Sequence, residues 1–432
     1  MADRSVPTTQ VAGPNQKAGE LGLAREAPGF WRRTFAALQH RNYRLWFLGQ
    51  LVSLVGTWMQ ITAQSFLVFQ LTHSTAYLGY VGFASGLPSW LFMLYGGVIA
   101  DRVSRRNLLV MTQSAMMVLA FVLAGLTFAK LVQPWQIVVL ALALGVANAF
   151  DAPARQAFVV ELVEREDVIN AIALNSSMFN LATVVGPTVA GLTYAAVGAS
   201  WCFTLNGVSF IAVIVALLLM KLQAHKVIPR ASSALAQLKE GIRYTVAHPV
   251  LRTLIAIAGV SALFGSAYST LMPAWAVDIL RGDATTNGLL QSARGAGSLV
   301  GALMIAAVAH RGGRGRWLTL GTFVYPVLLL GFAGVRALPL SLALLLGVGW
   351  GSMVVFNMAN NLVQTQVTDE LRGRVMAIYS LTFFGGMPLG ALLAGALAQV
   401  IGSPLTVAVS AAVTLACAAL FWIAAPRLRA LA

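Results

Sequence analysis

A compact group of charged residues interrupts two long apolar runs early in the chain. Between Tyr95 and Leu109 the sequence reads YGGVIADRVSRRNLL, and its ionisable members are Asp101, Arg102, Arg105 and Arg106. A carboxylate placed at the positive end of a helix is stabilised by about 0.3 to 1 kcal/mol. Such a contact can hold one conformation without making it permanent. The alternative for Arg105 and Arg106 is that they only mark the cytoplasmic side of a membrane.

A second candidate is a cation that falls inside an apolar segment. Arg294 is the one charge that we place within a predicted helix, and Gln291 and Ser298 share its helical face. A guanidinium at that depth could attract an anionic or carbonyl-rich ligand. The alternative is a side chain that reaches the outer interface about two turns away.

Other kinds of chemistry find little support in the sequence. Cys202 and Cys417 fall on separate apolar segments, so we expect no structural disulfide, and no Cys and His cluster has metal-ligand spacing. No nucleophile and base pair shares a common depth, so we expect neither an enzyme nor a cofactor. Asp101, Asp151 and Asp278 lie at predicted helix ends. No acid therefore falls near the middle of a span, although proton relays usually need one.

The composition indicates that lipid is the solvent. The chain has 432 residues, of which 58% are hydrophobic and 10% charged, with a mean hydropathy of +0.77. Soluble domains carry about 25% charged residues. Because a membrane helix needs roughly 20 apolar residues, this length allows about a dozen spans. We predict an all-α membrane protein with twelve transmembrane helices in two pseudo-symmetric six-helix bundles.

The positive charge predicts the orientation of these helices. The formal net charge is +15, with 29 Lys and Arg residues. We place only Lys130, Arg281 and Arg336 in external loops and Arg294 in a helix, and the rest on the cytoplasmic side. This asymmetry predicts that both termini are cytoplasmic. No aromatic-studded basic patch accompanies the charge, so we expect no nucleic-acid partner.

Composition and charge also divide the chain. The predicted parts are a disordered cytoplasmic tail (1–28), an N-terminal six-helix bundle (29–222), a cytoplasmic basic linker (223–251), a C-terminal six-helix bundle (252–425) and a cytoplasmic C-terminus (426–432). The fourth predicted span ends near residue 150, and the charged stretch 151–168 is read as a cytoplasmic loop with a short surface helix. The seventh is predicted as one helix over 253–277.

Polar residues concentrate on the first, fifth, eighth and tenth predicted spans, the first of which is predicted over residues 42–71. Polar faces in lipid must turn toward protein or a water-filled cavity. We favour a central substrate cavity over interhelical hydrogen bonding, which remains the alternative. The predicted cavity residues are Thr57, Gln60, Gln64, Asn175, Asn180, Gln291, Arg294, Asn357 and Asn361.

The charged turn at 97–106 resembles a loop signature of the major facilitator superfamily. Gly97 and the charged residues that follow match G-x-x-x-D-R-x-x-R-R, with Ser104 where the signature usually has Gly. The resemblance implies that Asp101 is the acid of a cytoplasmic gate and faces the start of the eleventh helix. The full predicted gate comprises Gly97, Asp101, Arg102, Arg105, Arg106, Asp151, Arg155, Asp369, Arg372 and Arg374.

A second resemblance concerns the direction of transport. Gly186, Pro187 and Gly191 match most of a helix 5 signature of antiporters in this superfamily, with Ala190 in one Gly position. A drug-exporter signature in helix 4 is only half present, because Ala141 stands where its Arg would be. Together with the gate loop, the helix 5 match favours export over uptake.

Several longer phrases resemble one bacterial branch of the superfamily. GQLVSLVGTWMQ (49–60), DAPARQAFVVELV (151–163) and DELRGRVMAIYS (369–380) are similar to enterobactin exporters and related drug and macrolide efflux proteins. This implies a monomeric exporter of a small organic molecule in the bacterial inner membrane, driven by protons. The alternatives are a lipid or lysolipid flippase of the same fold without proton coupling, a membrane enzyme, and a sensor that does not transport.

Overall fold

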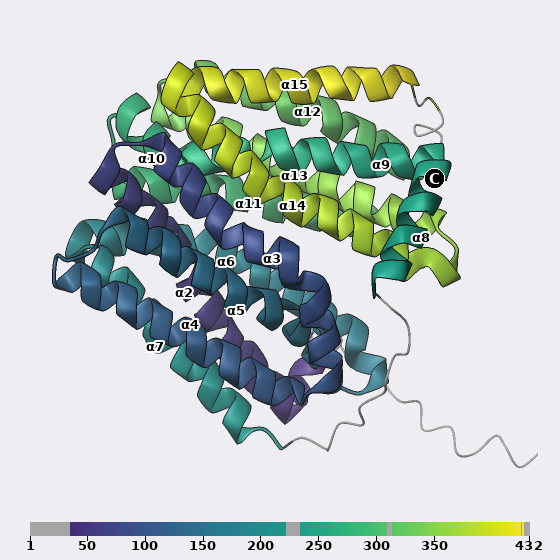
Figure 1. Ribbon diagram of the computed structural model, residues 1–432, viewed down its shortest axis with the longest axis horizontal. Helices are drawn as coiled ribbons and strands as arrows, with labels where there is room; N and C mark the ends of the chain where they lie inside the picture. Colours follow the sequence, from purple (N-terminus) through teal and green to yellow (C-terminus); the bar gives the residue numbers. More distant parts are fainter. Residues whose placement is uncertain (1–34, 222–233, 309–312, 425, 427–432) are drawn as a thin grey trace, which may run out of the picture.

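The computed structural model describes residues 35–221, 234–308, 313–424 and 426, and all regular structure in these ranges is helical. The predicted all-α class is confirmed. The predicted tail 1–28 and most of the predicted C-terminus 426–432 lie outside the described residues. The helices form two halves, one purple to teal and the other green to yellow (Figure 1).

The N-terminal half begins with a short 3-10 turn, η1 (Ala36–Gln39). Its six long helices are α2 (Arg41–Thr72), α3 (Thr75–Arg102), α4 (Arg105–Phe128), α5 (Pro134–Glu161), α6 (Val168–Val197) and α7 (Ala199–Leu219), with the 3-10 turn η2 (Arg165–Asp167) before α6. Consecutive helices run in opposite directions through the half.

The C-terminal half begins with the amphipathic helix α8 (Ala234–Ala247). There follow α9 (Pro249–Val260), η3 (Ser261–Gly265), η4 (Ala267–Leu271), α10 (Met272–Ala274), η5 (Trp275–Ile279), α11 (Ala284–Val308), α12 (Arg314–Gly334), α13 (Leu338–Gln366), α14 (Asp369–Ile401) and α15 (Ser403–Ala424). We call the end of the molecule that carries α8 the linker end, and the end with the turns at 73–74, 198, 280–283 and 402 the opposite end.

Eleven helical segments in the described part of the chain are long and apolar enough to cross a bilayer. They account for every long helix named above except α3, which has 28 residues. The predicted membrane fold is confirmed, whereas the predicted count of twelve spans is not reached by this criterion. Large apolar side chains at the surface, such as Val400 (82% exposed) and Ile169 (81% exposed), suit a protein surrounded by lipid.

Helix α5 is longer than the sequence suggests. It continues without a break through Pro153 to Glu161, so Asp151 lies within a helix and not in a loop. Pro153 has no N–H, which leaves the carbonyl of Ala149 without its usual helical donor. That carbonyl faces Gly96 on α3, where an added Cβ would lie 2.3 Å from the oxygen. The glycine thus lets the two backbones touch where the proline disturbs α5.

The seventh membrane segment is broken into several pieces. The predicted single helix over 253–277 is wrong, because π-helical turns flank the 3-10 turn η4 and the short α10. Pro273 cannot donate to the preceding turn. Tyr325 of α12 also donates a hydrogen bond to the carbonyl of Gly265. Irregular turns of this kind often lie at functional sites.

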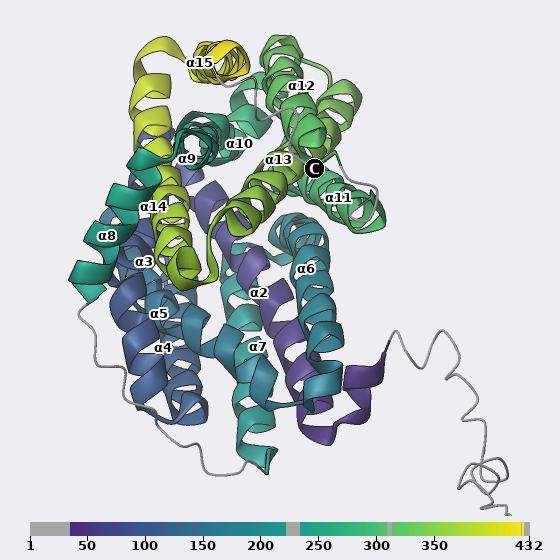
Figure 2. The same cartoon turned by 90° about the vertical axis from the view of Figure 1, so that its right-hand side faces the viewer.

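The two halves meet mainly through two helix pairs, α3 with α14 and α6 with α11. Both views show these pairs side by side between the halves (Figures 1 and 2). Small residues make the approach possible. A Cβ added to Gly79 would lie 2.9 Å from the carbonyl oxygen of Ala391, and one added to Gly86 would lie 2.8 Å from Pro388. Such close backbone contact is typical of membrane helices.

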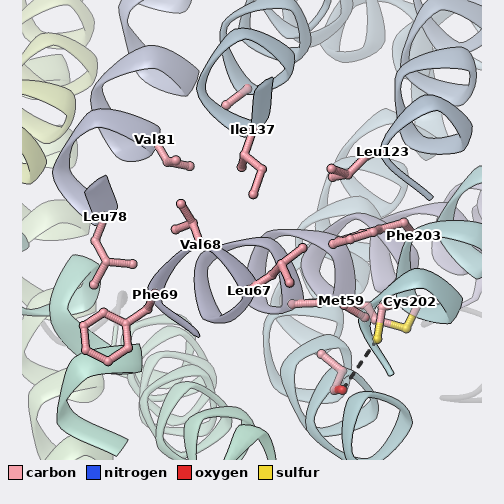
Figure 3. Packing of buried hydrophobic residues seen from close by; sticks show 14 of the residues in the cluster. Met59, Leu67, Val68, Phe69, Leu78, Val81, Leu123, Ile137, Cys202 and Phe203 are labelled. Atoms are coloured by element: carbon pink, nitrogen blue, oxygen red, sulfur yellow. Dashed lines mark hydrogen bonds between the residues drawn. The ribbon is translucent and has the colours of Figure 1, made fainter. Parts of the chain in front are cut away.

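A cluster of buried apolar side chains packs the N-terminal half toward the opposite end (Figure 3). Its members come from several helices, for example Leu67 from α2, Leu78 from α3 and Ile137 from α5. Cys202 lies in this cluster and directs its Sγ to the carbonyl of Ala190 at 3.7 Å. Both cysteines are free in the structure. Because lipid is as apolar as these side chains, close packing rather than exclusion of water stabilises the cluster.

Candidate functional site

The predicted gate loop lies at the linker end between α3 and α4. Arg105 donates to Glu161 of α5 at 2.5 Å and to the carbonyl of Ala157 at 3.3 Å. Arg106 donates to the carbonyl of Leu218 on α7 at 3.0 Å. These two arginines therefore tie α4 to α5 and α7 within the N-terminal half.

Other members of the predicted loop contribute less to this packing. Arg102 is exposed. A Cβ added to Gly97 would meet nothing within 4 Å. The side chain of Asp101 lies outside the described residues, so its contact with the start of α14 stays a prediction.

The charged residues at the start of α14 make contacts within the C-terminal half. Arg372 pairs with Asp369 at 2.5 Å, one turn earlier, and donates to the carbonyl of Gln364 at 3.3 Å. Arg374 pairs with Glu240 of α8 at 2.6 Å. These contacts hold α8 against the linker end of α14. Sequence reasoning did not anticipate the role of Glu240.

Asp151 and Arg155 form a buried polar site inside the N-terminal half. The carboxylate is 1% exposed. Its Oδ1 accepts hydrogen bonds from the Thr112 hydroxyl and the Gln113 amide of α4, both at 2.9 Å. Its Oδ2 lies 3.5 Å from Nε of Arg155. The sequence carried a signal for Thr112 and Gln113, since adjacent polar residues in an apolar helix need partners.

The antiporter-type residues of α6 lie in close helix contacts. A Cβ added to Gly186 would lie 2.5 Å from Cβ of Trp58 on α2. Gly191 lies close to the carbonyl of Ala284 on α11. A Cβ added to Gly288 of α11 would lie 2.4 Å from the carbonyl oxygen of Pro187. The motif therefore builds part of the α6 and α11 contact between the halves.

Pro187 has the same effect on its helix as Pro153 has on α5. It deprives the carbonyl of Thr183 of its helical donor. A Cβ added to Gly295 of α11 would lie 2.5 Å from that oxygen. Twice in this molecule, a proline-freed carbonyl faces a glycine of a neighbouring helix.

The predicted cavity residues of the N-terminal half divide into two groups. Gln60 is buried and accepts a hydrogen bond from Asn206 of α7 at 2.7 Å, so it serves packing inside the half. Gln64 is also buried. Thr57, Asn175 and Asn180 are partly exposed. Interhelical hydrogen bonding, the alternative to a substrate cavity, thus accounts for Gln60 in this structure. Thr57, Asn175 and Asn180 remain available to a ligand.

Arg294 occupies the middle of α11 and faces the broken segment. Its guanidinium lies beside Tyr268 of η4 and Tyr325 of α12. Its Nε is buried without a hydrogen-bond acceptor. Among the described residues no carboxylate pairs with it. Tyr268 and Tyr325 were missed by sequence reasoning, because the break that brings η4 to α11 was not predicted.

The remaining predicted cavity residues of the C-terminal half differ in exposure. Gln291 is buried, one turn from Arg294. Asn357 is exposed and donates to the carbonyl of Met353 in its own helix at 3.2 Å, and Asn361 is exposed as well. Both asparagines lie on the part of α13 nearer the linker end.

A cavity of about 430 Å³ opens at the opposite end between the halves. It is lined by α2, α6 and the turn before α11, through Phe66, Phe69, Gln70, His73, Tyr194, Ala195, Val277, Gly282, Asp283 and Ala284. On the side of the cavity that the N-terminal half forms, Tyr194 donates a hydrogen bond to Gln70 at 2.6 Å. Carboxylate, imidazole and aromatic groups thus meet at this end of the seam.

Comparison with protein families gives one match that covers nearly the whole chain. Residues 32–431 match the model of a family described as transmembrane secretion effector. Curated relatives include a staphyloferrin A transporter of Staphylococcus aureus, 24% identical over 83% of this chain and 90% of that protein. The multidrug efflux pump Tap of Mycolicibacterium fortuitum is 29% identical over 80% and 87%.

A third relative is the enterobactin exporter EntS of Escherichia coli, 27% identical over 83% of this chain and 85% of that protein. Solved structures share the fold at lower identity. A bacterial homologue of the lysosomal transporter Spinster, inward-facing and unoccupied, gives a TM-score of 0.70 at 14% identity over 90% of this chain and 98% of that one. An inward-facing bacterial ferroportin homologue gives 0.65 at 19% identity over 89% and 98%.

Proposed function

Because the chain belongs to the transmembrane secretion effector family of the major facilitator superfamily, we propose that it exports a small organic molecule by alternating access. It is a multi-pass membrane transporter and not an enzyme. Beyond membership of the family, we propose the direction of substrate movement, the class of substrate and its coupling to an inward flow of protons. It also places the protein in a bacterial inner membrane with both termini in the cytoplasm, working as a monomer.

The distribution of contacts between the halves carries the proposal. The closest approaches run from Thr75 and Gly395 at the opposite end to Trp90 and Gly385 on one seam. On the other seam they run from Gly191 to Gly295, as described above. Nearer the linker end, Asn175 and Asn180 are partly exposed and Asn357 and Asn361 are exposed. This pattern favours a substrate path that is open at the linker end and is closed by these helix contacts before it reaches the cavity at the opposite end.

Arg294 suggests the chemical character of the substrate. Its guanidinium has no carboxylate partner among the described residues and lies beside two tyrosines. Arg294 is partly buried, and a cation that is partly removed from water without a counter-ion is costly, so a bound anion would lower that cost. We infer that the substrate carries a carboxylate, a phenolate or a dense set of carbonyl oxygens. Two of the curated relatives are named for transport of siderophores, staphyloferrin A and enterobactin.

The test is substrate-dependent proton movement in vesicles. The purified protein is reconstituted with a pH-sensitive dye inside, and a panel of anionic, cationic and neutral compounds is added. We expect an anionic compound of the panel to cross the membrane in one direction and to drive protons in the other. Transport without proton movement would overturn the coupling, and lipid translocation without transport of any compound would favour the flippase.

A further inference from the structure

Asp151 is the one buried acidic side chain in the described parts of the chain, at 1% exposure. It is residue 18 of the 28 in α5, so it lies roughly 25 Å along the helix from the opposite end at 1.5 Å per residue. An ionisable residue at such a position in a membrane helix is costly to bury and is usually functional. The question is whether this carboxyl only ties α4 to α5 or also binds a proton.

The hydrogen bonds of the site suit the ionised carboxyl. Thr112 and Gln113 each donate to Oδ1 at 2.9 Å, and Nε of Arg155 lies 3.5 Å from Oδ2. Donors and a positive charge on an ionised carboxylate satisfy its lone pairs. This much would also be expected of a purely structural carboxylate.

The surrounding acceptors suit the protonated carboxyl as well. The Thr112 hydroxyl lies 3.1 Å from the carbonyl of Leu109, so it can donate its hydrogen bond there and accept a hydrogen bond from the protonated carboxyl of Asp151. Gln113 is 1% exposed, and its Oε1 is buried without a hydrogen-bond partner. Rotation of that amide would present Oε1 to the acid proton. A buried amide oxygen without a partner calls for an explanation, and a protonated Asp151 would supply its donor.

We propose that Asp151 is the residue that binds and releases the transported proton. This inference rests on the proposed proton-coupled export and names its proton site. A proton from one aqueous side adds to Oδ1 or Oδ2 and gives the neutral acid, which releases it to the other side after the halves have moved. Protonation of Asp151 removes the counter-ion of Arg155, whose Nε lies 3.5 Å from Oδ2 of Asp151 in the structure.

Other charged groups near this end of α5 are engaged elsewhere or lie at the surface. On α4, Arg105 donates to Glu161 and Arg106 to the carbonyl of Leu218. Arg102 on α3 and the pair Arg41 and Arg44 on α2 are exposed. On α6, the titratable side chain in the described sequence is Tyr194, far away at the opposite end. Arg155 is therefore the described charge that faces Asp151.

The position of Asp151 connects its charge to the contact between the halves. Ala149 and Pro153, two residues to either side, press against Gly96 of α3. Helix α3 in turn makes the tight contact with α14 of the other half. A change in the α4 to α5 hydrogen bonds can thus shift the helix on which the two halves pivot.

The first experiment compares uphill and exchange transport in proteoliposomes. Asp151→Asn keeps the size of the side chain and an Oδ1 that can accept from Thr112 and Gln113, but it gives up the contact with Arg155 and cannot change charge. We expect it to lose export driven by a proton gradient and substrate-induced proton movement, while exchange of labelled for unlabelled substrate continues. Glu166→Gln, at an exposed acid of η2, is the matched control and should behave as wild type. Proton-driven export at the wild-type level by Asp151→Asn would overturn the proposal.

The second experiment needs no substrate and therefore separates this proposal from the proposed function. Infrared difference spectra of the reconstituted protein are recorded between low and high pH. We expect a carboxylic acid C=O band that appears on acidification in wild type and in Glu166→Gln and is missing in Asp151→Asn. Unchanged spectra in Asp151→Asn would overturn the proton site. The expected band without any exported compound would leave the site standing and reject the export function.

Discussion

At single positions along the helices, glycines let the backbones of neighbouring helices touch. Gly96 is the clearest case, because an added Cβ would lie 2.3 Å from the carbonyl oxygen of Ala149. The oxygen belongs to the backbone and cannot rotate away as a flexible side chain would. The α3 and α5 helices must therefore separate to accept any larger residue.

We predict that Gly96→Ala lowers the stability of the protein by about 1 to 3 kcal/mol, the usual cost of overpacking. Thermal unfolding of the purified protein in detergent measures the effect. Gly125→Ala is the control, since a Cβ there would meet nothing within 4 Å. Equal midpoints for the two variants would contradict the close contact between α3 and α5.

A second residue-scale prediction concerns Arg294. Arg294→Ala should lower export about 10- to 150-fold while insertion in the membrane stays normal, because a hydrogen bond to a charged group contributes about 1.5 to 3 kcal/mol. Arg294→Lys retains the charge without the planar fork and should recover part of the activity. Export and membrane content are measured in the same cells. Wild-type export by the alanine variant would refute the role.

The sequence identified several of these residues but not their surroundings. Asp151 and Arg155 were predicted as gate residues, yet Asp151 was placed at a helix end because the charged stretch that begins there was read as a loop. Gln60 belongs to a polar stripe that one helix alone cannot orient, and its partner Asn206 is 146 residues away. Partners so distant in sequence are not visible without a fold.

At the scale of elements, the long regular helices were predictable and the irregular ones were not. The predicted first span, 42–71, differs by one residue at each end from α2, because an apolar run between polar turns defines a membrane helix. The seventh segment follows no such rule. Its π and 3-10 turns depend on Tyr325 from a different helix, which removes the Gly265 carbonyl from the helical pattern.

The docking of α8 on α14 gives an element-scale prediction. Charge reversal at either partner, Glu240→Arg or Arg374→Glu, should speed protease cleavage within α8. The double reversal should restore protection, because it rebuilds an ion pair. The pair is partly exposed, so we expect each single change to cost only about 0.2 to 1 kcal/mol. Cleavage at the same rate in all four proteins would mean that other contacts hold α8.

At the scale of the whole molecule, the two halves are joined at the opposite end. Ser74 at the start of α3 donates to Gln399 of α14 at 2.8 Å, and Thr75 donates to the carbonyl of Gly395 at 3.1 Å. Alternating access requires these contacts to break once in each cycle. The general plan of two bundles was predictable from the sequence, whereas the side on which they meet was not, because it depends on contacts between helices far apart in the chain.

We predict that a covalent bridge at this end arrests transport. Cysteines at Ser74 and Gln399, in a background without Cys202 and Cys417, are joined by a short thiol-specific cross-linker with a reducible bond. Export should stop on cross-linking and return on reduction. Each single cysteine variant is the control, and continued export by the bridged protein would show that this contact need not open.

Reciprocal opening of the two ends is the central claim, and paired spin-label distances test it most directly. One pair joins the halves at the linker end, at Arg165 and Glu370, and the other joins them at the opposite end, at Leu131 and Val400, all of which are exposed. On addition of substrate and acid in lipid, we predict that the distance at the linker end shortens while that at the opposite end lengthens. Unchanged distances in a preparation that transports would contradict the account.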